Sequence, residues 1–326
     1  MPKQVVVIGA LDTKGEDFAF IKERIEERGF KAIVVDVGVM GEPPFKPDVD
    51  ADAVAKAGGE SLSSLRAKGD KGNAMVVMTR GATEIAKKLY AEGRLDAIFG
   101  MGGSAGTAII SAAMRALPLG VPKVLVSTVA SGDTKPYVGT KDIVMIPSIV
   151  DVAGVNVISA EIYSRAVGAI VGMLETDIPK IESKPLIAAS MFGNTTQLIN
   201  QCRDIMERAD FEVMVFHATG TGGMTMEDLI ENGYFVGALD LTTTELADEL
   251  CGGVMSAGPK RLTAAGLKGI PQVVAPGCLD MVNFWAVDKV PEKYKSRKLY
   301  PWNPNVTLMR TTPEENAKLG QIMTQR

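Results

Sequence analysis

The chain has 326 residues, of which 46% are apolar and 23% charged, and its formal net charge is −4. A chain of this length is expected to form two domains, and without a basic excess it is not expected to bind nucleic acid or an anionic membrane. Its three cysteines lie far apart without a CxxC pair, which argues against a disulfide framework or a thiolate zinc site. No signal peptide and no run of about 18 apolar residues is found, so we expect a soluble protein of the reducing cytoplasm.

The first half of the chain alternates between predicted strands and helices. The β-branched run Val5–Ile8 is typical of a parallel strand buried on both faces, and a turn over 9–15 is expected after it. Apolar residues then recur at helical spacing, and a second strand over 32–35 ends at Asp36. Further along we expect a helix over 73–92, strands over 95–99, 123–127 and 142–146, and a helix over 155–174.

The second half begins in the same way, with a strand over 186–190 and then a helix to about residue 208. The segment Phe211–His217 resembles Phe30–Asp36 at a constant offset of 181, which would place Asp36 and His217 at equivalent strand ends. The halves are either related βαβ designs or alike only because α/β units resemble one another.

A stretch with two prolines and mixed charges, residues 175–185, is the predicted linker between the halves. The alternation of strands and helices predicts an α/β fold class with two Rossmann-like, doubly wound domains of mainly parallel sheets. We expect a first, nucleotide-binding domain over residues 1–178 and a second α/β domain over 185–326.

The strongest local signal for ligand binding is the glycine-rich segment Gly100–Thr107. It follows a predicted strand and opens a helix, so its free N–H groups can hold a phosphate, with hydroxyl donors added by Ser104 and Thr107. No lysine follows at the place that a Walker A loop requires. The looser dinucleotide pattern is present, but no acidic residue lies about 20 positions on to hold a ribose. The alternative is a tight structural turn that needs glycine for packing alone.

Two other strand ends in the first half carry polar residues. In Leu11-Asp12-Thr13-Lys14, the lysine can contact phosphate, and Asp12 or Thr13 can meet a metal-bound water or a sugar hydroxyl; equally, the segment is a helix start capped by Asp12 or Thr13. The segment Ser127–Thr134 is rich in small hydroxyl residues that suit the phosphates or sugar of a nucleotide, and the alternative is a solvated turn.

The second half offers further candidates. The turn His217–Gly223 can form another anion-binding site, and His217, the sole histidine, is a candidate general acid or base or else a structural group. Asp240, Asp248 and the run Thr242–Glu245 can support magnesium, although a capped and charged helix start also explains them. A stretch expected to be irregular contains several polar side chains, of which Arg310 can pair with an anion: Asn283, Arg297, Asn303, Asn305 and Arg310.

Six motifs in order resemble a known family over essentially the whole chain: Ala10–Glu16, Gly102–Thr107, Pro122–Thr134, Met191–Thr196, Phe216–Gly223 and Leu239–Asp248. This is the microbial family related to the N-terminal ATP-binding domain of the tomato mosaic virus resistance protein. The resemblance implies two Rossmann-like subdomains, ATP with Mg²⁺ bound in the first, and a homodimer. The nucleotide contacts that it implies are Leu11, Asp12, Thr13, Lys14, Gly102, Gly103, Ser104, Gly106, Thr107, Thr128, Ala130 and Ser131.

The chain departs from the family pattern in two places. Trp302 stands where a histidine is expected, and this change argues against an acid/base role at that position. The chain ends at Arg326, short of a further strand and helix typical of the family, so we expect the second domain to lack its C-terminal segment.

Three functional hypotheses follow. The first is an ATP-binding protein that holds the nucleotide on the strand-end loops of the first domain and carries out a small-molecule reaction between the domains. The second is a non-catalytic module in which ATP stabilises a dimer that binds a protein partner. The third is an NAD-dependent oxidoreductase, motivated by the glycine pattern alone. The sequence leaves open whether the protein is an enzyme.

Overall fold

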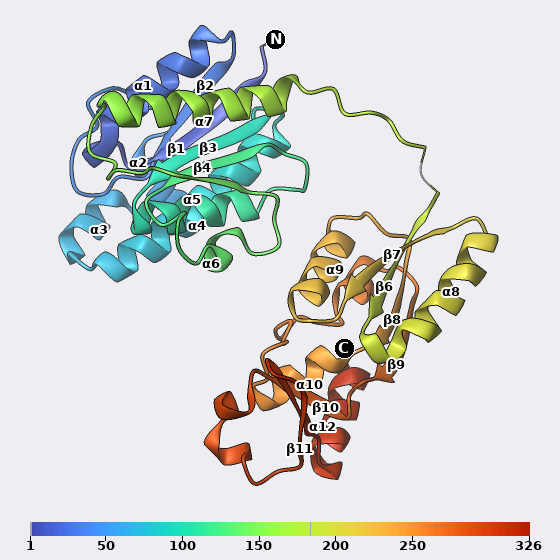
Figure 1. Ribbon diagram of the computed structural model, residues 1–326. Coiled ribbons are helices and arrows are strands. Elements are labelled where there is room, and N and C mark those ends of the chain that lie inside the picture. The colour runs from blue at the N-terminus through green and yellow to red at the C-terminus, as the bar shows by residue number, and fades with distance from the viewer. Residues whose placement is uncertain (1, 183) are drawn as a thin grey trace. The chain divides into compact units, whose positions relative to one another are not determined.

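The computed structural model describes residues 2–182 and 184–326. The chain divides into two compact units, Met1–Pro179 and Lys180–Arg326, which also differ in colour in Figure 1. The last helix of the first unit ends at Glu175, and the first strand of the second begins at Leu186. The predicted linker therefore spans the boundary between the units.

The first unit is built on one five-stranded parallel sheet with the order β2-β1-β3-β4-β5. The strands carry the apolar runs of the sequence, because a parallel sheet covered on both faces buries both sets of side chains. Their bounds are Gln4–Gly9 for β1, Lys31–Asp36 for β2, Ala97–Gly102 for β3, Lys123–Ser127 for β4 and Val144–Pro147 for β5.

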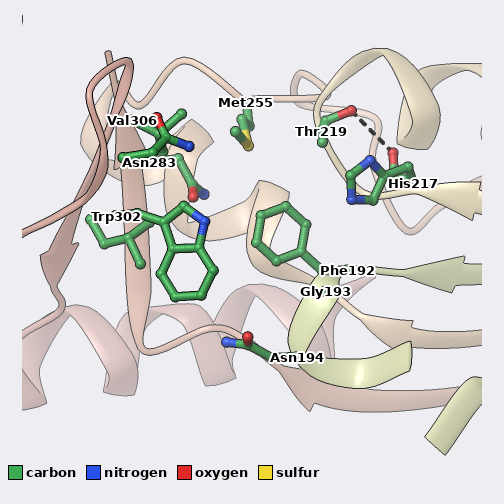
Figure 2. A pocket seen from close by; sticks show the side chains of 11 residues that line it. Phe192, Gly193, Asn194, His217, Thr219, Met255, Asn283, Trp302 and Val306 are labelled. Carbon is green, nitrogen blue, oxygen red and sulfur yellow. Dashed lines mark hydrogen bonds between the residues drawn. The ribbon is translucent and has the colours of Figure 1, made fainter. Parts of the chain in front are cut away.

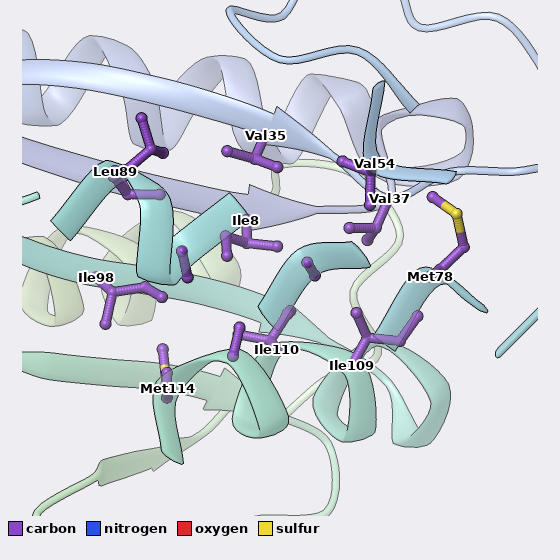
Figure 3. Packing of buried hydrophobic residues seen from close by; sticks show 14 of the residues in the cluster. Ile8, Val35, Val37, Val54, Met78, Leu89, Ile98, Ile109, Ile110 and Met114 are labelled. Atoms are coloured by element: carbon purple, nitrogen blue, oxygen red, sulfur yellow. The ribbon is translucent and has the colours of Figure 1, made fainter. Parts of the chain in front are cut away.

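Helices cover both faces of this sheet, as expected of a doubly wound fold. The helices are α1 (Leu11–Glu27), α2 (Ala51–Ala57), α3 (Leu62–Lys68), α4 (Lys71–Ala91), α5 (Ser104–Arg115), α6 (Lys135–Val138) and α7 (Val157–Glu175). Alternate strand residues divide between two cores. One core packs against α2, α4 and α5 and contains Ile8, Val54 and Ile110 (Figure 3), and the other packs against α1 and α7.

Two helices of the first unit approach each other so closely that only glycine fits. A Cβ on Gly81 of α4 would lie 1.9 Å from the Val54 carbonyl oxygen of α2, and one on Gly58 would lie 2.1 Å from the Val77 carbonyl oxygen. The contact between α2 and α4 therefore depends on glycine, which has no side chain, at positions 58 and 81.

By length and composition, α7 is the one helix in the described part of the chain that could span a membrane. Its residues Tyr163, Val167 and Ile170 are buried in the core that it shares with α1. Its apolar composition is thus used to cover the sheet.

The second unit contains a four-stranded parallel sheet with the order β7-β6-β8-β9. Its strands are β6 (Leu186–Met191), β7 (Glu212–His217), β8 (Gly237–Thr242) and β9 (Gln272–Gly277). The helical elements around it are η1 (Gly193–Thr195), α8 (Thr196–Arg208), α9 (Thr221–Glu231), α10 (Thr244–Cys251) and α11 (Ala264–Lys268). Two Rossmann-like parallel sheets in one chain confirm the predicted fold class.

The end of the chain is not irregular, contrary to our expectation for the stretch from Asn283 to Arg310. It forms a three-stranded antiparallel sheet with the order β10-β12-β11, from β10 (Met281–Phe284), β11 (Leu299–Asn303) and β12 (Val306–Arg310). The segments η2 (Val287–Lys289) and η3 (Glu292–Tyr294) connect β10 to β11, and α12 (Pro313–Gln325) follows the sheet. Buried residues of β10, β12, α10 and α12 form a separate core.

The two units place Asp36 and His217 at matching positions. In the first, β1 pairs with β2 so that Gly9 lies beside Asp36, and in the second, β6 pairs with β7 so that Met191 lies beside His217. Each of the two residues is the last of an edge strand, and that strand pairs with the first strand of its unit. The constant offset of 181 between the two segments predicts this equivalence.

Candidate functional site

Three of the predicted segments lie at one edge of the first-unit sheet, which we call the loop edge: residues 10–14, 102–107 and 127–134. They follow β1, β3 and β4, which are neighbours in the sheet. The strand order reverses between β1 and β3, and in open α/β sheets ligands bind outside the carboxyl ends of the strands at such a point. The fold therefore brings the predicted nucleotide contacts together.

The segment after β1 is a helix start and not an open turn. Helix α1 begins at Leu11, and the expected turn over 9–15 is reduced to an irregular residue at Lys14 with φ −134° and ψ 23°. The buried Asp36 carboxylate accepts hydrogen bonds from the Leu11 and Gly38 backbone N–H groups at 3.0 and 2.8 Å. Burial nevertheless raises the pKa of Asp36 above its ordinary value. Thus the cap of α1 comes from β2 and not from Asp12 or Thr13.

The side chains of this segment are partly committed to the protein itself. Asp12 accepts hydrogen bonds from the Met40 and Gly41 backbone N–H groups at 2.8 and 3.3 Å, and the Lys14 ammonium donates to the Val152 carbonyl oxygen. Thr13 is exposed. A ligand at this segment would contact Thr13 directly. The Lys14 ammonium would first have to break its hydrogen bond to the Val152 carbonyl oxygen before it could contact the ligand.

The segment after β3 has the open helix start that the glycine pattern predicts. Gly103 is the N-cap of α5, and no side chain caps the helix. The Thr107 N–H donates to the Gly103 carbonyl oxygen at 2.8 Å, but among the described residues nothing accepts from the N–H groups of Ser104, Ala105 and Gly106. These three donors therefore lie free at the positive end of the helix.

Thr107 corrects one expectation. Its hydroxyl is fully buried, 2.6 Å from the Ser127 hydroxyl and 3.3 Å from the Gly102 carbonyl oxygen to which it donates, and so it cannot face a ligand. It joins the ends of β3 and β4 instead. A side chain at this helix position points to the sheet, and glycine spacing alone does not reveal that direction.

The segment after β4 lies against the α5 start. The Thr128 N–H donates to the Gly102 carbonyl oxygen at 3.3 Å, and a Cβ on Gly103 would lie 3.8 Å from the Thr128 hydroxyl oxygen. Thr128 and Ser131 are exposed and Ala130 is half-buried. The accessible hydroxyl of Thr128 thus lies next to the start of α5, and Ser131 is exposed on the same loop.

In the second unit, a cluster of charges is buried around one arginine. The Arg261 side chain is fully buried and donates to Glu245 at 2.6 Å, to Glu227 at 3.1 Å and, through two nitrogens, to both oxygens of Asp240 at 2.5 Å. Attraction to these carboxylates raises the pKa of Arg261 above its ordinary value despite burial. Arg261 and Glu227 do not stand out in the sequence, since nothing in their spacing links them to β8 and α10.

The same cluster explains the turn His217–Gly223. The Glu245 carboxylate accepts hydrogen bonds from the Gly220 and Gly223 N–H groups at 2.7 and 3.0 Å, and a Cβ on Gly223 would lie 2.1 Å from that carboxylate. The turn does bind an anion at the start of α9, as its composition predicts, but the anion is Glu245 of the same unit. It is therefore not an open site.

Asp248 and Asn283 form a second buried polar pair. Asp248 on α10 accepts hydrogen bonds from the Asn283 backbone N–H at 2.6 Å and from its Nδ2 at 2.8 Å. Burial raises the pKa of Asp248 to about 7, and the neighbouring Glu245 charge adds to the rise. The Asn283 Oδ1 is buried without a hydrogen-bond partner among the described residues.

The Asn283 side chain belongs to the floor of a pocket of about 270 Å³ in the second unit. The segment after β6 supplies Phe192 and Asn194, the end of β7 supplies His217, and the antiparallel sheet supplies Trp302 (Figure 2). The His217 ring stacks on Phe192 with the ring centroids 5.3 Å apart, and among the described residues its nitrogens have no hydrogen-bond partner. His217 therefore faces a cavity, as a candidate acid or base must.

The carboxylates that we considered for magnesium are otherwise engaged. Asp240 and Glu245 pair with Arg261. Arg310, the candidate for pairing with an anion, forms a salt bridge with Asp280 at 3.0 Å. No group of three His, Cys, Asp or Glu side chains that could hold a metal ion is found in residues 2–182 and 184–326. The three cysteines are free thiols, with Cys251 buried.

Comparison with known proteins gives matches along both units. Residues 3–179 match the N-terminal domain, and residues 184–326 the C-terminal domain, of the uncharacterised protein family UPF0261. A UPF0261 protein of Clostridium tetani is 53% identical over 324 residues, which is 99% of this chain and 80% of that protein.

More distant relatives come from other bacteria and from a plant. A UPF0261 protein of Rhizobium meliloti is 44% identical and covers 98% of this chain and 79% of its own length. The tomato (Solanum lycopersicum) ToMV resistance protein Tm-1(GCR237) is 36% identical over 99% of this chain, which corresponds to 46% of the tomato protein. On these matches, and with the two parallel-sheet units that they cover, the chain belongs to the UPF0261 family.

Proposed function

We propose that the first unit binds ATP at the loop edge, with the phosphates at the start of α5. The observation that carries this proposal is the set of three free N–H groups at Ser104, Ala105 and Gly106, next to the exposed hydroxyl of Thr128. Backbone N–H groups at the start of a helix of this length are a ready site for a phosphate. The choice of ATP among phosphate compounds rests on the family resemblance of the loop-edge motifs.

The residues of the loop edge fit a nucleotide, and the predicted contacts would have different roles in holding it. Gly103 leaves open space beside Thr128, and the N–H groups that follow it would hold phosphate oxygens. Thr13 and Ser131, both exposed, would meet other parts of the nucleotide, and Thr107 would position the loop through its bond to Ser127. Mg²⁺ usually keeps several waters and binds one or two carboxylates together with substrate phosphates, so we propose that it accompanies the triphosphate.

We also propose a cytoplasmic location, as the spacing of the cysteines suggests, and a homodimer, as the family resemblance implies. His217 is the candidate acid or base for any reaction, and it lies in the other unit.

Titration calorimetry with ATP, NAD and inorganic phosphate, each with and without Mg²⁺, tests the proposal. Three variants at Gly103 sharpen it, because φ is −75° there and an added Cβ meets nothing closer than 3.8 Å. Gly103→Ala and Gly103→Asn should keep the fold and bind ATP within about threefold of the parent. Gly103→Asp places a negative charge among the phosphate donors and should weaken ATP binding by about tenfold or more, roughly the effect of 1.4 kcal/mol.

Equal ATP affinity of the Asp and Asn variants would show that the phosphates do not lie at α5. The absence of saturable ATP binding to the parent protein would reject ATP as the ligand. Tighter binding of NAD than of ATP would favour the oxidoreductase hypothesis.

A further inference from the structure

The pocket of the second unit is independent of the proposed ATP site and has a chemistry of its own. Its volume is about 270 Å³, and it lies between the loops after β6 and β7 and the antiparallel sheet. Ligand pockets in proteins usually measure about 300–1,000 Å³, so this one suits a molecule of one or two fused rings.

The hydrogen-bonding pattern fixes which way the Asn283 amide points. Its backbone N–H and its Nδ2 donate to the two oxygens of the Asp248 side chain, and in its ionised form that group can only accept. With Asp248 ionised, the amide nitrogen faces it, which leaves Oδ1 on the other side. This oxygen has no hydrogen-bond partner among the described residues although Asn283 is 1% exposed.

An unpartnered buried acceptor is unfavourable, and in native proteins such a group needs an explanation. Asn283 lies in the pocket floor, opposite Leu308 in the register between β10 and β12. Figure 2 shows its amide among Met255, Trp302 and Phe192. A donor on a bound molecule would satisfy the oxygen.

The walls of the pocket are mainly aromatic and apolar, with the polar side chains of Asn194, Thr219 and Asn303 among them. Phe192, with His217 stacked on it, forms one side, and Trp302 with Val306 forms another (Figure 2). Leu308 also lines the pocket. The register of β11 against β12 shifts between Pro301 and Asn303, so Trp302 stands at the irregularity. The residue is 61% exposed, so one face of the pocket is open to solvent. Among the described lining residues there is no Asp, Glu, Lys or Arg.

From these features we infer that the pocket is a binding site for a small, uncharged heteroaromatic compound. The ring packs against Phe192 and Trp302, and a ring N–H or an amino group on it donates to Asn283 Oδ1. A charged ligand is disfavoured, because no opposite charge lines the pocket to offset its loss of hydration. Aromatic faces and a buried acceptor without a partner together select a flat ring with a donor at its edge.

Two probes of the same shape test the inference with the full chain. Indole carries a ring N–H, and benzofuran has an oxygen in its place. Ligand-observed NMR should show that indole binds with a Kd of about 0.1–1 mM, as expected of so small a molecule. Benzofuran should bind at least about tenfold more weakly, because it cannot satisfy Asn283 and presents an acceptor to an acceptor.

Two tryptophan variants locate the binding. Trp302→Ala should weaken indole binding by about tenfold or more, whereas Trp285→Ala, which removes a similarly exposed ring outside the pocket, should change it by less than about twofold. Both side chains are more than half exposed, so the fold should survive, and circular dichroism checks this.

Equal affinity for indole and benzofuran would overturn the role of Asn283. Indole binding that is unchanged in Trp302→Ala, or absent in the parent protein, would overturn the site. Gly103→Asp should leave indole binding unaffected, so failure of this inference and failure of the ATP proposal give different results.

Discussion

Replacing Asp248 by Asn should change how the stability of the second unit depends on pH. Asp248 is fully buried, and the pKa of its carboxyl is raised from 3.8 to about 7, first by burial and then by the Glu245 charge. Between these values the folded protein holds a proton that the unfolded chain has released. Raising the pH therefore favours the unfolded state, and the stabilising effect of the raised pKa is full below 3.8 and is lost as pH rises through about 7.

The size of the effect follows from the shift. Three pKa units at about 1.4 kcal/mol each amount to roughly 4 kcal/mol over the whole range, and linkage places about 2.5 kcal/mol of this between pH 5 and pH 8. Asn has the shape of Asp but does not titrate. The free energy of unfolding of the parent, minus that of Asp248→Asn, should thus fall by about 2.5 kcal/mol from pH 5 to pH 8.

Urea unfolding followed by tryptophan fluorescence measures this difference at each pH. Both tryptophans of the chain, Trp285 and Trp302, lie in the unit that contains Asp248, so the signal reports on that unit. Asp204→Asn, on the exposed surface of α8, controls for the loss of one charge. A difference that stays constant from pH 5 to pH 8, or that rises, would refute the assignment of a raised pKa to Asp248.

Other substitutions test the buried charges and the helix contact. Arg261→Met should lower the free energy of unfolding of the second unit by about 3–5 kcal/mol, because it leaves buried carboxylates without their cation; a loss below about 1 kcal/mol in urea unfolding would contradict this. Gly81→Ala should destabilise the first unit by about 1–3 kcal/mol, since its Cβ would meet the Val54 carbonyl oxygen at 1.9 Å. Gly168→Ala in α7, where no atom lies within 4 Å of the new Cβ, should stabilise the same unit by up to about 1 kcal/mol. Circular dichroism during urea unfolding measures the free energy of unfolding of both variants. Equal values for Gly81→Ala and Gly168→Ala would show that α2 and α4 can move apart to accommodate the added Cβ.

The fold was largely predictable because parallel sheets buried on both faces leave continuous apolar runs in the sequence. Val5–Ile8 lies within β1, and the expected strand over 123–127 has the bounds of β4. The antiparallel sheet escaped prediction for the opposite reason. Its strands have four or five residues, and β11 contains a proline, so no run or alternation is long enough to stand out.

Contacts between distant side chains limited the prediction of the sites. The composition of Gly220–Gly223 correctly indicates an anion at the start of α9, but only the fold shows that Glu245 supplies it. In the same way, the cap of α1 comes from Asp36, 25 residues away from Leu11. Residue types indicate that a helix start needs an anion; they do not tell whether the chain or the solution provides it.

The contrast between α9 and α5 has a thermodynamic consequence. The carboxylate at the start of α9 is tethered to its own unit, and so its presence does not depend on any concentration. An anion at α5 must come from solution, and a ligand that binds only the folded state stabilises it by about 2.7 kcal/mol at a hundred times its Kd. The first unit would therefore melt at a temperature that reports the supply of its ligand, while the start of α9 keeps its anion whatever the solution contains.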